Sequence, residues 1–96
     1  MEHFFVVYDF SDDSRRAKFV KILEKYGMRI QYSIFEFSIT NARKIEMIGL
    51  LKNGDFLQNN KNEAIMIIPI SIDIAKKILR YGETVNLVGK AGIFFI

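Results

Sequence analysis

The order of short apolar runs and amphipathic stretches is the feature that most restricts how this chain can fold. FFVVY, near the start, is too short for a buried helix and is rich in β-branched and aromatic residues, which is typical of a central strand. Residues 63–70, EAIMIIPI, have the same character, and Pro69 favours an edge or a strand end because it cannot donate to a ladder. Residues 29–39, RIQYSIFEFSI, alternate polar and apolar residues and predict two short strands joined around Tyr32 and Ser33.

Amphipathic stretches separate these strands. The first predicted helix has Ser11 as its N-cap and ends at Gly27, and its inward residues are Phe19, Val20, Leu23 and Tyr26. The second begins at Thr40 or Asn41 and ends at Asn53-Gly54, before the polar loop DFLQNNKN, and its inward residues are Ile45, Ile48 and Leu51. A short third helix is predicted in residues 71–80, with Ala75, Ile78 and Leu79 inward, followed by the strand-like pieces VNLV and GIFFI.

The order strand, helix, strand, strand, helix, strand predicts an α+β fold, a ferredoxin-like β-α-β-β-α-β sandwich with both helices on one face of an antiparallel sheet. The opposite face is then left uncovered. If Phe4, Val6 and their neighbours project there, the simplest cover is the same face of a second copy, and GIFFI is placed to extend the partner's sheet edge. We therefore predict one domain over residues 1–96 and a homodimer, with residues 83–96, approximately, associated with the partner.

Composition excludes several kinds of site. The chain has no cysteine, so neither a disulfide framework nor a thiolate metal site is available. His3 is the single histidine, which excludes a multi-histidine metal site within one chain, and the scattered glycines form no phosphate-cradling loop. The N-terminus lacks the features of a secretory signal, and the apolar runs are far too short for a membrane span. We expect a cytoplasmic protein that does not contact a membrane.

The net charge of +3 is concentrated in one segment. Residues 12–30 hold six basic side chains against three acidic ones, while the two signs balance in the rest of the chain. The basic residues are Arg15, Arg16, Lys18, Lys21, Lys25 and Arg29. The segment is either a solvated helix face or a surface that faces phosphates.

The stretch YDFSDD places three aspartates directly after an apolar strand. Asp12 and Asp13 are explained by the first turn of a helix, where carboxylates are favoured by about 0.3 to 1 kcal/mol each. Asp9 lies before the N-cap, so helix capping does not account for it. It is either an Asx-type turn residue or a ligand for Mg²⁺, with Mn²⁺ also accepted by an oxygen-only site. One carboxylate binds Mg²⁺ weakly, but a dimer axis passing near Asp9 would supply a second one from the other copy.

Arg16 falls within the apolar arc of the first predicted helix, so its side chain should point toward the end of the first strand. It either forms a salt bridge to Asp9 or Asp13, or holds a scissile phosphate as a bidentate donor. Lys18, Lys21 and Lys25 face outward and are either solvated or able to follow a nucleic-acid backbone.

Taken in this order and spacing, the segments VVYDFSDDSRRAKFVKILEKYGMRIQYSIFE and IIPI resemble the small universal CRISPR-associated adaptation protein, the ferredoxin-like nuclease partner of the CRISPR integrase. The most specific parts are YDxxDDxRR and QYSxFE. The resemblance covers nearly the whole chain and implies a homodimer with Asp9 as the divalent-metal ligand of both subunits. It also implies that Tyr8, Arg16, Arg29 and Phe35 match positions linked to activity, and that Lys18 matches a position that is commonly basic. We predict that these residues and Arg15 bind nucleic acid.

Together these features predict a Mg²⁺-dependent endonuclease that cleaves single-stranded RNA or double-stranded DNA and takes part in spacer acquisition with the integrase, with Asp9 and Arg16 catalytic. Two alternatives share the fold: a non-catalytic bridge that binds DNA in the integration complex, and a related toxin ribonuclease. A regulatory dimer that binds a small ligand would explain the fold but not the pairing of Asp9 with Arg16.

Overall fold

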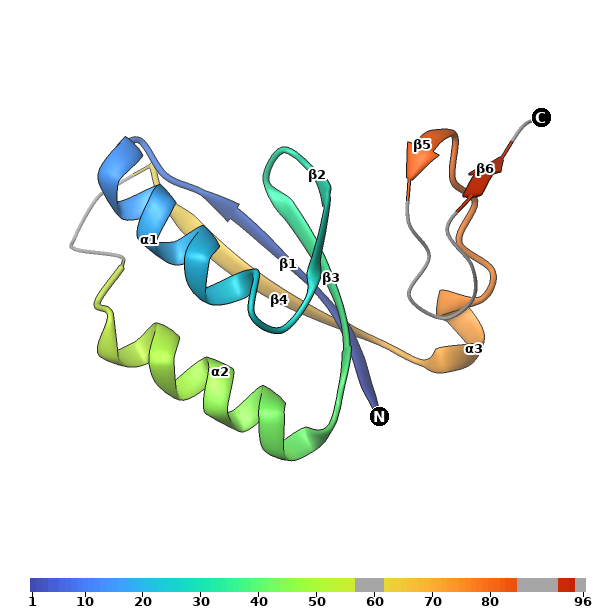
Figure 1. Ribbon diagram of the computed structural model, residues 1–96, viewed down its shortest axis with the longest axis horizontal. Coiled ribbons are helices and arrows are strands. Elements are labelled where there is room, and N and C mark those ends of the chain that lie inside the picture. Colours follow the sequence, from blue (N-terminus) through green and yellow to red (C-terminus); the bar gives the residue numbers. More distant parts are fainter. Residues whose placement is uncertain (57–61, 85–91, 95–96) are drawn as a thin grey trace.

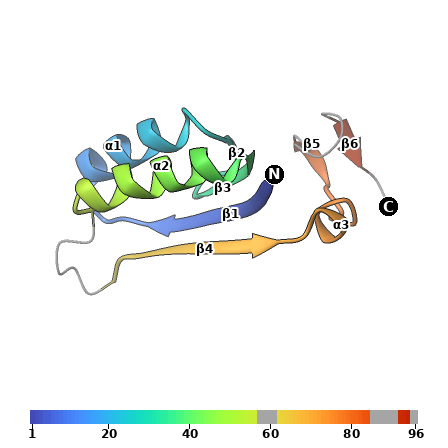
Figure 2. The same cartoon turned by 90° about the horizontal axis from the view of Figure 1, so that it is seen from below.

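The computed structural model describes residues 1–56, 62–84 and 92–94. Its four-stranded sheet is antiparallel and has the order β2-β3-β1-β4. Both long helices lie on one face of this sheet (Figures 1 and 2). The elements are β1 (Glu2–Asp9), α1 (Asp13–Leu23), β2 (Met28–Gln31), β3 (Ile34–Ile39), α2 (Asn41–Asn53) and β4 (Ala64–Ile70). The predicted α+β, ferredoxin-like order is confirmed, and in the described part of the chain no helix is long and apolar enough to cross a membrane.

Strand β1 is central and pairs with β3 on one side and β4 on the other. Phe4 and Val6 are fully buried beneath the helices, so the expectation that they line the uncovered face is wrong. The alternation of the strand places Phe5 and Val7 on that face instead, opposite Ile68 and Met66 of β4. The uncovered face is therefore apolar, as predicted, but the residues that form it are Phe5 and Val7, with Met66 and Ile68 beside them.

The core lies between the sheet and the two helices. Aromatic rings fill much of it, and the rings of Phe4 and Phe37 stack with centroids 4.7 Å apart. In α2 the buried residue is Met47, with Ile48 and Leu51 packed beside it, whereas Ile45 is 62% exposed. Ile45 lies two positions before Met47 and so falls on the opposite side of a helix with 3.6 residues per turn, which corrects its predicted inward position.

The helix termini follow capping chemistry with one shift. Asp12, not Ser11, is the N-cap of α1, and its carboxylate accepts from the amide of Ser14 at 3.0 Å. The helix ends at Leu23, and a turn leads to Gly27. Thr40 caps α2 as predicted, accepting from the amide of Arg43.

Gly27 lies where the chain turns from α1 into β2. A Cβ at this position would lie against the ring of Phe37 and 2.6 Å from the carbonyl oxygen of Glu36. Because the carbonyl is part of the sheet and cannot move freely, we expect Gly27→Ala to destabilise the fold by about 1 to 3 kcal/mol. Urea unfolding measures this effect. Gly49→Ala is the control, because a Cβ there meets no atom within 4 Å, and equal stability of the two variants would contradict the prediction.

After β4 the chain forms a short helix, α3 (Ile72–Ala75), capped by Ser71. Ala75 is buried as predicted, but Leu79 is 69% exposed, because the helix ends before it and does not carry it inward. Strands β5 (Gly82–Thr84) and β6 (Gly92–Phe94) pair with each other. VNLV and the loop at residues 57–61 lie outside the described residues, and addition of GIFFI to a partner's sheet stays a prediction.

A buried ionic cluster ties the segment after α3 to the sheet face opposite the helices. Glu36 of β3 is fully buried, and one of its carboxylate oxygens accepts from Nη2 of Arg80 and bonds Nε2 of His3, each at 2.8 Å. All three side chains are at most 4% exposed. This end of the face is therefore covered by the chain's own C-terminal half, while the end nearer Asp9 is not.

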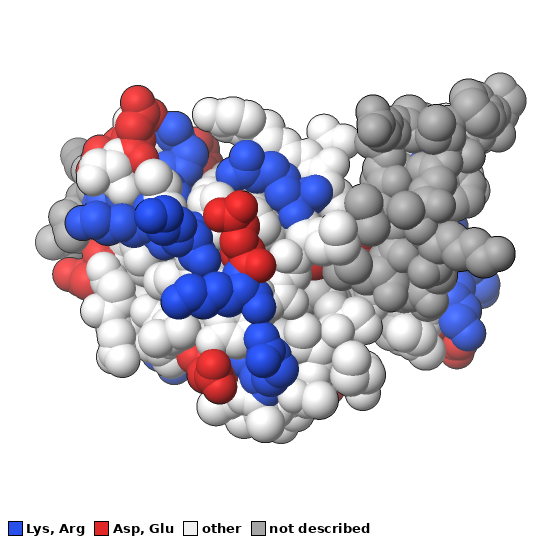
Figure 3. Space-filling view, viewed as in Figure 1, with Lys and Arg blue, Asp and Glu red and all other residues white. Residues whose placement is uncertain are grey.

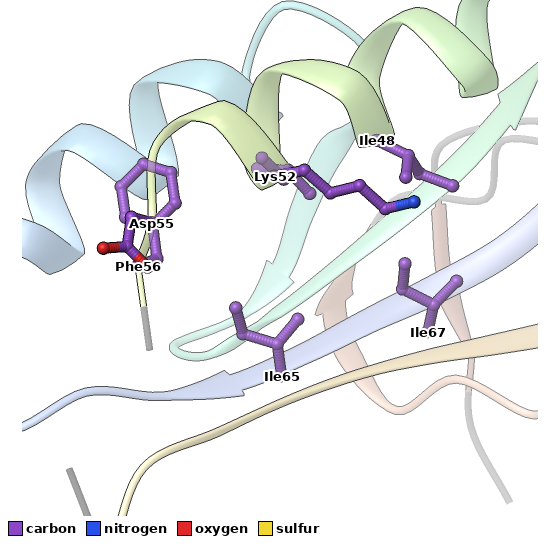
Figure 4. A pocket seen from close by; sticks show the side chains of 7 residues that line it. Ile48, Lys52, Asp55, Phe56, Ile65 and Ile67 are labelled. Carbon is purple, nitrogen blue, oxygen red and sulfur yellow. The ribbon is translucent and has the colours of Figure 1, made fainter. Parts of the chain in front are cut away.

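On the helix side, an apolar pocket of about 310 Å³ opens between α2 and the edge strand β4 (Figure 4). Ile48 and Lys52 line it from the helix, and Ile65 and Ile67 line it from the strand. Asp9 is not among its lining residues. The pocket is thus separate from the surface that carries the candidate site.

Candidate active site

Asp9 is the last residue of the central strand, and its side chain is exposed. It pairs with Ala64, the first residue of β4, and shares the uncovered sheet face with Val7. A hollow of about 450 Å³ lies beside it, lined by Val7, Tyr8, Asp9, Ser33, Ala64 and Met66. A buried strand therefore presents a single carboxylate at the end of an apolar surface.

The side-chain hydrogen bonds near Asp9 are formed by the residues that follow it. Within the described part of the chain they engage Ser11, Asp12 and Asp13, and none reaches the carboxylate of Asp9. An Asx-type turn requires the side chain to bond the backbone about two residues further on, but the amide of Ser11 instead donates to Glu63. Turn formation therefore does not account for Asp9 in this structure.

The side chain of Arg16 points from α1 toward the end of the first strand, as its helical phase predicted. Its Nη1 pairs with Asp13 at 2.7 Å, and its Nη2 donates to the carbonyl of Phe10 at 2.9 Å. Of the two predicted salt-bridge partners, Asp13 is therefore the one it takes. The second contact holds the peptide group one residue beyond Asp9, so Arg16 acts on the backbone that follows the carboxylate.

Arg15 is engaged by other side chains and does not point into solvent. Its Nη1 and Nη2 donate to the two carboxylate oxygens of Glu63 at 2.6 and 2.7 Å, while Nε donates to Asp12. Nη1 also donates to the carbonyl of Phe56. With 14% of its side chain exposed and all three nitrogens in use, Arg15 is poorly placed for the predicted contact with nucleic acid.

Glu63 accepts hydrogen bonds from both Arg15 and Ser11. Its side chain is 1% exposed and accepts from the amide and hydroxyl of Ser11, at 2.8 and 2.6 Å. The hydrogen bonds from Arg15, followed by those from Ser11, lower the pKa of the Glu63 carboxyl from 4.5 to about 2. A charged carboxylate is thereby stabilised between the start of α1 and the start of β4.

This lowered pKa predicts a pH dependence of stability. The unfolded chain takes up a proton at Glu63 as the pH falls through about 4.5, but the folded chain does so only near 2, so acid favours unfolding in this window. We expect wild-type stability to fall between about pH 5 and 2 more steeply than that of Glu63→Gln. Urea unfolding at a series of pH values measures the two slopes. Parallel curves for the two proteins would refute the expectation.

The predicted aromatic residues are buried. Tyr8 is 2% exposed and its hydroxyl donates to the carbonyl of Tyr32, while Phe35 is 1% exposed. Neither ring offers a face to a nucleic acid here, so an effect of either residue on activity would act through packing. Arg29 is exposed on β2 with its guanidinium 5.5 Å from the ring centre of Phe35, and Lys18 is exposed on α1.

Basic side chains form a band across the helix face of the molecule (Figure 3). Lys18, Lys21 and Lys25 are all exposed along α1 and the turn after it, and Arg43 of α2 continues the band by donating to the carbonyl of Lys25. Acidic side chains interrupt it. The excess of basic residues in segment 12–30 thus lies largely on the helix face, on the opposite side of the sheet from Asp9.

The family to which these features point is settled by comparison of sequences. The sequence model of the CRISPR associated protein Cas2 family matches residues 1–78. The chain belongs to the Cas2 family. This match spans β1 through α3 and so includes Asp9, Arg16 and Glu63.

Individual Cas2 relatives agree with the family match. A protein of Archaeoglobus fulgidus named CRISPR-associated endoribonuclease Cas2 is 36% identical over 93 residues, covering 95% of this chain and 96% of that protein. A solved structure described as a partial Cas6-RT-Cas1–Cas2 complex is 32% identical, with a TM-score of 0.68, covering 81% of this chain and 88% of that one. A hypothetical protein of Thermus thermophilus, 24% identical with a TM-score of 0.64 and 98% of each chain covered, shares the fold.

Sequence reasoning missed two sets of buried contacts in this Cas2 family member, those of Glu63 near Asp9 and those of Glu36 at the other end of the sheet face. Glu63 follows a polar loop, and nothing in NKNEA distinguishes it from a solvated residue. Glu36 was visible within QYSxFE, but its partners His3 and Arg80 are 33 and 44 residues away. These contacts depend on tertiary proximity, so local patterns carry no signal for them.

Proposed function

We propose that this Cas2 family member is a divalent-metal-dependent endonuclease of CRISPR adaptation, acting as a homodimer in which Asp9 of each copy contributes to one metal site. The observation that carries the proposal is the exposed, unbonded carboxylate of Asp9 on an apolar sheet face within the described chain. Phe5 and Val7 continue that face toward Met66 and Ile68, which are 55% and 39% exposed. A second copy covering this surface would bring its own Asp9 close to the first.

The available ligands suit Mg²⁺ or Mn²⁺. Among the described residues, no group of three or more His, Cys, Asp or Glu side chains could hold an ion, so one chain offers the carboxylate of Asp9. Mg²⁺ commonly takes one or two carboxylates and completes its shell with water and phosphate oxygens. When bound, such an ion would polarise a phosphodiester and lower the pKa of a coordinated water. The chain's own contribution would be to present Asp9 at the C-terminal end of β1.

The basic band favours a second role beside catalysis. Exposed lysines spaced along α1 are suited to phosphate contacts that do not depend on base sequence. In the solved Cas6-RT-Cas1–Cas2 complex described above, a Cas2 chain occurs together with Cas1. We propose that this chain likewise joins a CRISPR integrase and holds DNA along α1, whether or not Asp9 is catalytically active there.

Cleavage assays test the enzymatic proposal. Labelled single-stranded RNA and double-stranded DNA are incubated with wild type and with Asp9→Ala, each in Mg²⁺, in Mn²⁺ and in excess chelator. We expect cleavage of at least one substrate that chelator and the substitution both abolish. Cleavage that persists in both conditions would refute a metal nuclease at Asp9. If neither substrate is cut and DNA binding weakens steeply with salt in both proteins, the bridging role alone is supported.

The dimer is tested separately by light scattering. We expect the wild type to have the mass of two chains, and Met66→Lys combined with Ile68→Lys to shift it toward one, because both lysines would enter the proposed interface. A monomeric wild type would refute a site shared between two Asp9 residues.

A further inference from the structure

The two residues that follow Asp9 are held by side chains from elsewhere in the chain. The carbonyl of Phe10 accepts from Arg16 Nη2 at 2.9 Å. The amide of Ser11 donates to Glu63 at 2.8 Å, and its hydroxyl donates to the same oxygen at 2.6 Å. The backbone is thus fixed on the C-terminal side of Asp9, immediately after β1 ends.

Glu63 is also connected to Asp9 through the sheet. It directly precedes Ala64, which pairs with Asp9 at the end of the β1–β4 ladder. One buried carboxylate therefore joins the residue two positions after Asp9 to the strand that pairs with Asp9. Arg15 keeps Glu63 in place through its two hydrogen bonds from α1.

We propose that Glu63 is a positioning residue for Asp9, which fixes the backbone that presents this carboxylate to a divalent cation. The inference rests on the proposed metal site. It concerns how the ligand is oriented, and Glu63 itself is too deeply buried to be a ligand, with 1% of its side chain exposed.

The physical reason lies in the lack of other restraints on Asp9. Its carboxylate receives no hydrogen bond from the described residues, so its direction depends on its backbone and its rotamer. Groups that orient metal ligands commonly change metal affinity or activity by about 10- to 100-fold when they are removed. Loss of Glu63 would free the Ser11 peptide and the first residue of β4, and Asp9 would then sample more orientations.

Binding of Mn²⁺ without substrate gives a readout that is independent of catalysis. The free ion is followed by electron paramagnetic resonance during titration of wild type, Glu63→Ala, Glu63→Gln and Asp9→Ala. We expect Glu63→Ala to weaken Mn²⁺ binding by about tenfold. Glu63→Gln should recover part of it, because its amide oxygen can still accept from Ser11, although its NH2 group would then face Nη1 of Arg15 and lose that bond.

A matched control separates positioning from general loss of stability. Glu46 of α2 also accepts a hydrogen bond between elements, from the hydroxyl of Tyr26 at 2.6 Å, but it lies at the other end of the helix pair. Glu46→Ala should lower the melting temperature without weakening Mn²⁺ binding. If Glu46→Ala and Glu63→Ala weaken binding equally, or if folded Glu63→Ala binds as wild type does, the inference is wrong.

Two further variants cover the remaining outcomes. If Glu63→Ala does not fold, Ser11→Ala replaces it, because it removes one of the two Ser11 bonds, and unchanged Mn²⁺ binding in that variant overturns the inference. If Asp9→Ala binds Mn²⁺ as tightly as wild type, the proposed metal site itself fails. Weaker binding in Asp9→Ala together with wild-type binding in Glu63→Ala would leave the metal site intact and refute only the role of Glu63.

Discussion

Asp9→Asn is expected to lower metal-dependent cleavage by about a thousandfold while leaving the fold intact. The substitution keeps the shape of the side chain and removes its charge, so a hard cation loses its anionic ligand. Metal ions contribute several kcal/mol to the stabilisation of charge in such reactions, and about 4 kcal/mol corresponds to a thousandfold change in rate. Because Asp9 is exposed and has no hydrogen-bond partner in the described chain, its replacement should not alter the melting temperature. Single-turnover cleavage in Mg²⁺ measures the effect.

Asp12→Asn is the natural control for this experiment. Asp12 is three residues away and is also exposed, but its carboxylate caps α1 and pairs with Arg15. Asparagine is an equally good N-cap, so the helix should remain and cleavage should stay within a few-fold of wild type. Equal losses in the two variants would show that the general charge of the YDFSDD segment matters and that Asp9 has no special role.

Arg80→Ala is expected to destabilise the fold by about 3 to 5 kcal/mol, because it leaves a buried carboxylate without its cation. Glu36 is fully buried, and Arg80 is the arginine that reaches it, at 2.8 Å. This loss would be a large part of the total stability of a chain of 96 residues. Chemical denaturation at neutral pH, followed by circular dichroism, gives the change directly.

Two further variants isolate the cause of that loss. Arg43→Ala removes an arginine whose guanidinium lies 4.8 Å from the ring centre of Tyr26 at the surface, and it should cost about 0.5 to 1 kcal/mol. The double variant Glu36→Gln with Arg80→Met removes the stranded charge, while glutamine still bonds His3, so it should be more stable than Arg80→Ala. A double variant that is no more stable than Arg80→Ala would contradict an electrostatic origin.

Local sequence patterns predicted the elements well because their causes are local. FFVVY and MIIPI are strands by composition, and Thr40 caps a helix through its own hydroxyl. The N-cap of α1 was misplaced by one residue, since Ser11 and Asp12 are both good caps. In the structure the hydroxyl of Ser11 donates to Glu63, and Asp12 caps the helix. Phe4 and Val6 were placed on the wrong face because FFVV is apolar at every position and so gives no alternation to read.

The candidate site was predictable only in part for the same reason. Asp9 stood out by position, since no capping rule required it. Arg16 was placed correctly by helical phase, but its contact with the carbonyl of Phe10 depends on how the chain leaves β1. Glu63 joins Ser11 and Arg15 across 52 and 48 residues, a relation that exists only after the sheet has formed.

The position of β1 at the centre of the sheet has a consequence for synthesis of the protein. One neighbour of this strand is β3, but the other is β4, so that His3 pairs with Ile70. The chain between His3 and Ile70 must fold back before β1 and β4 can pair, and this loop closure costs entropy before any contact is gained. Pairings between residues so far apart in the sequence therefore form slowly. A ribosome must therefore release β4 (Ala64–Ile70) before the first strand has both neighbours. Until then the edge of β1 that pairs with β4 keeps unpaired backbone donors and acceptors, which are open to strands of other nascent chains.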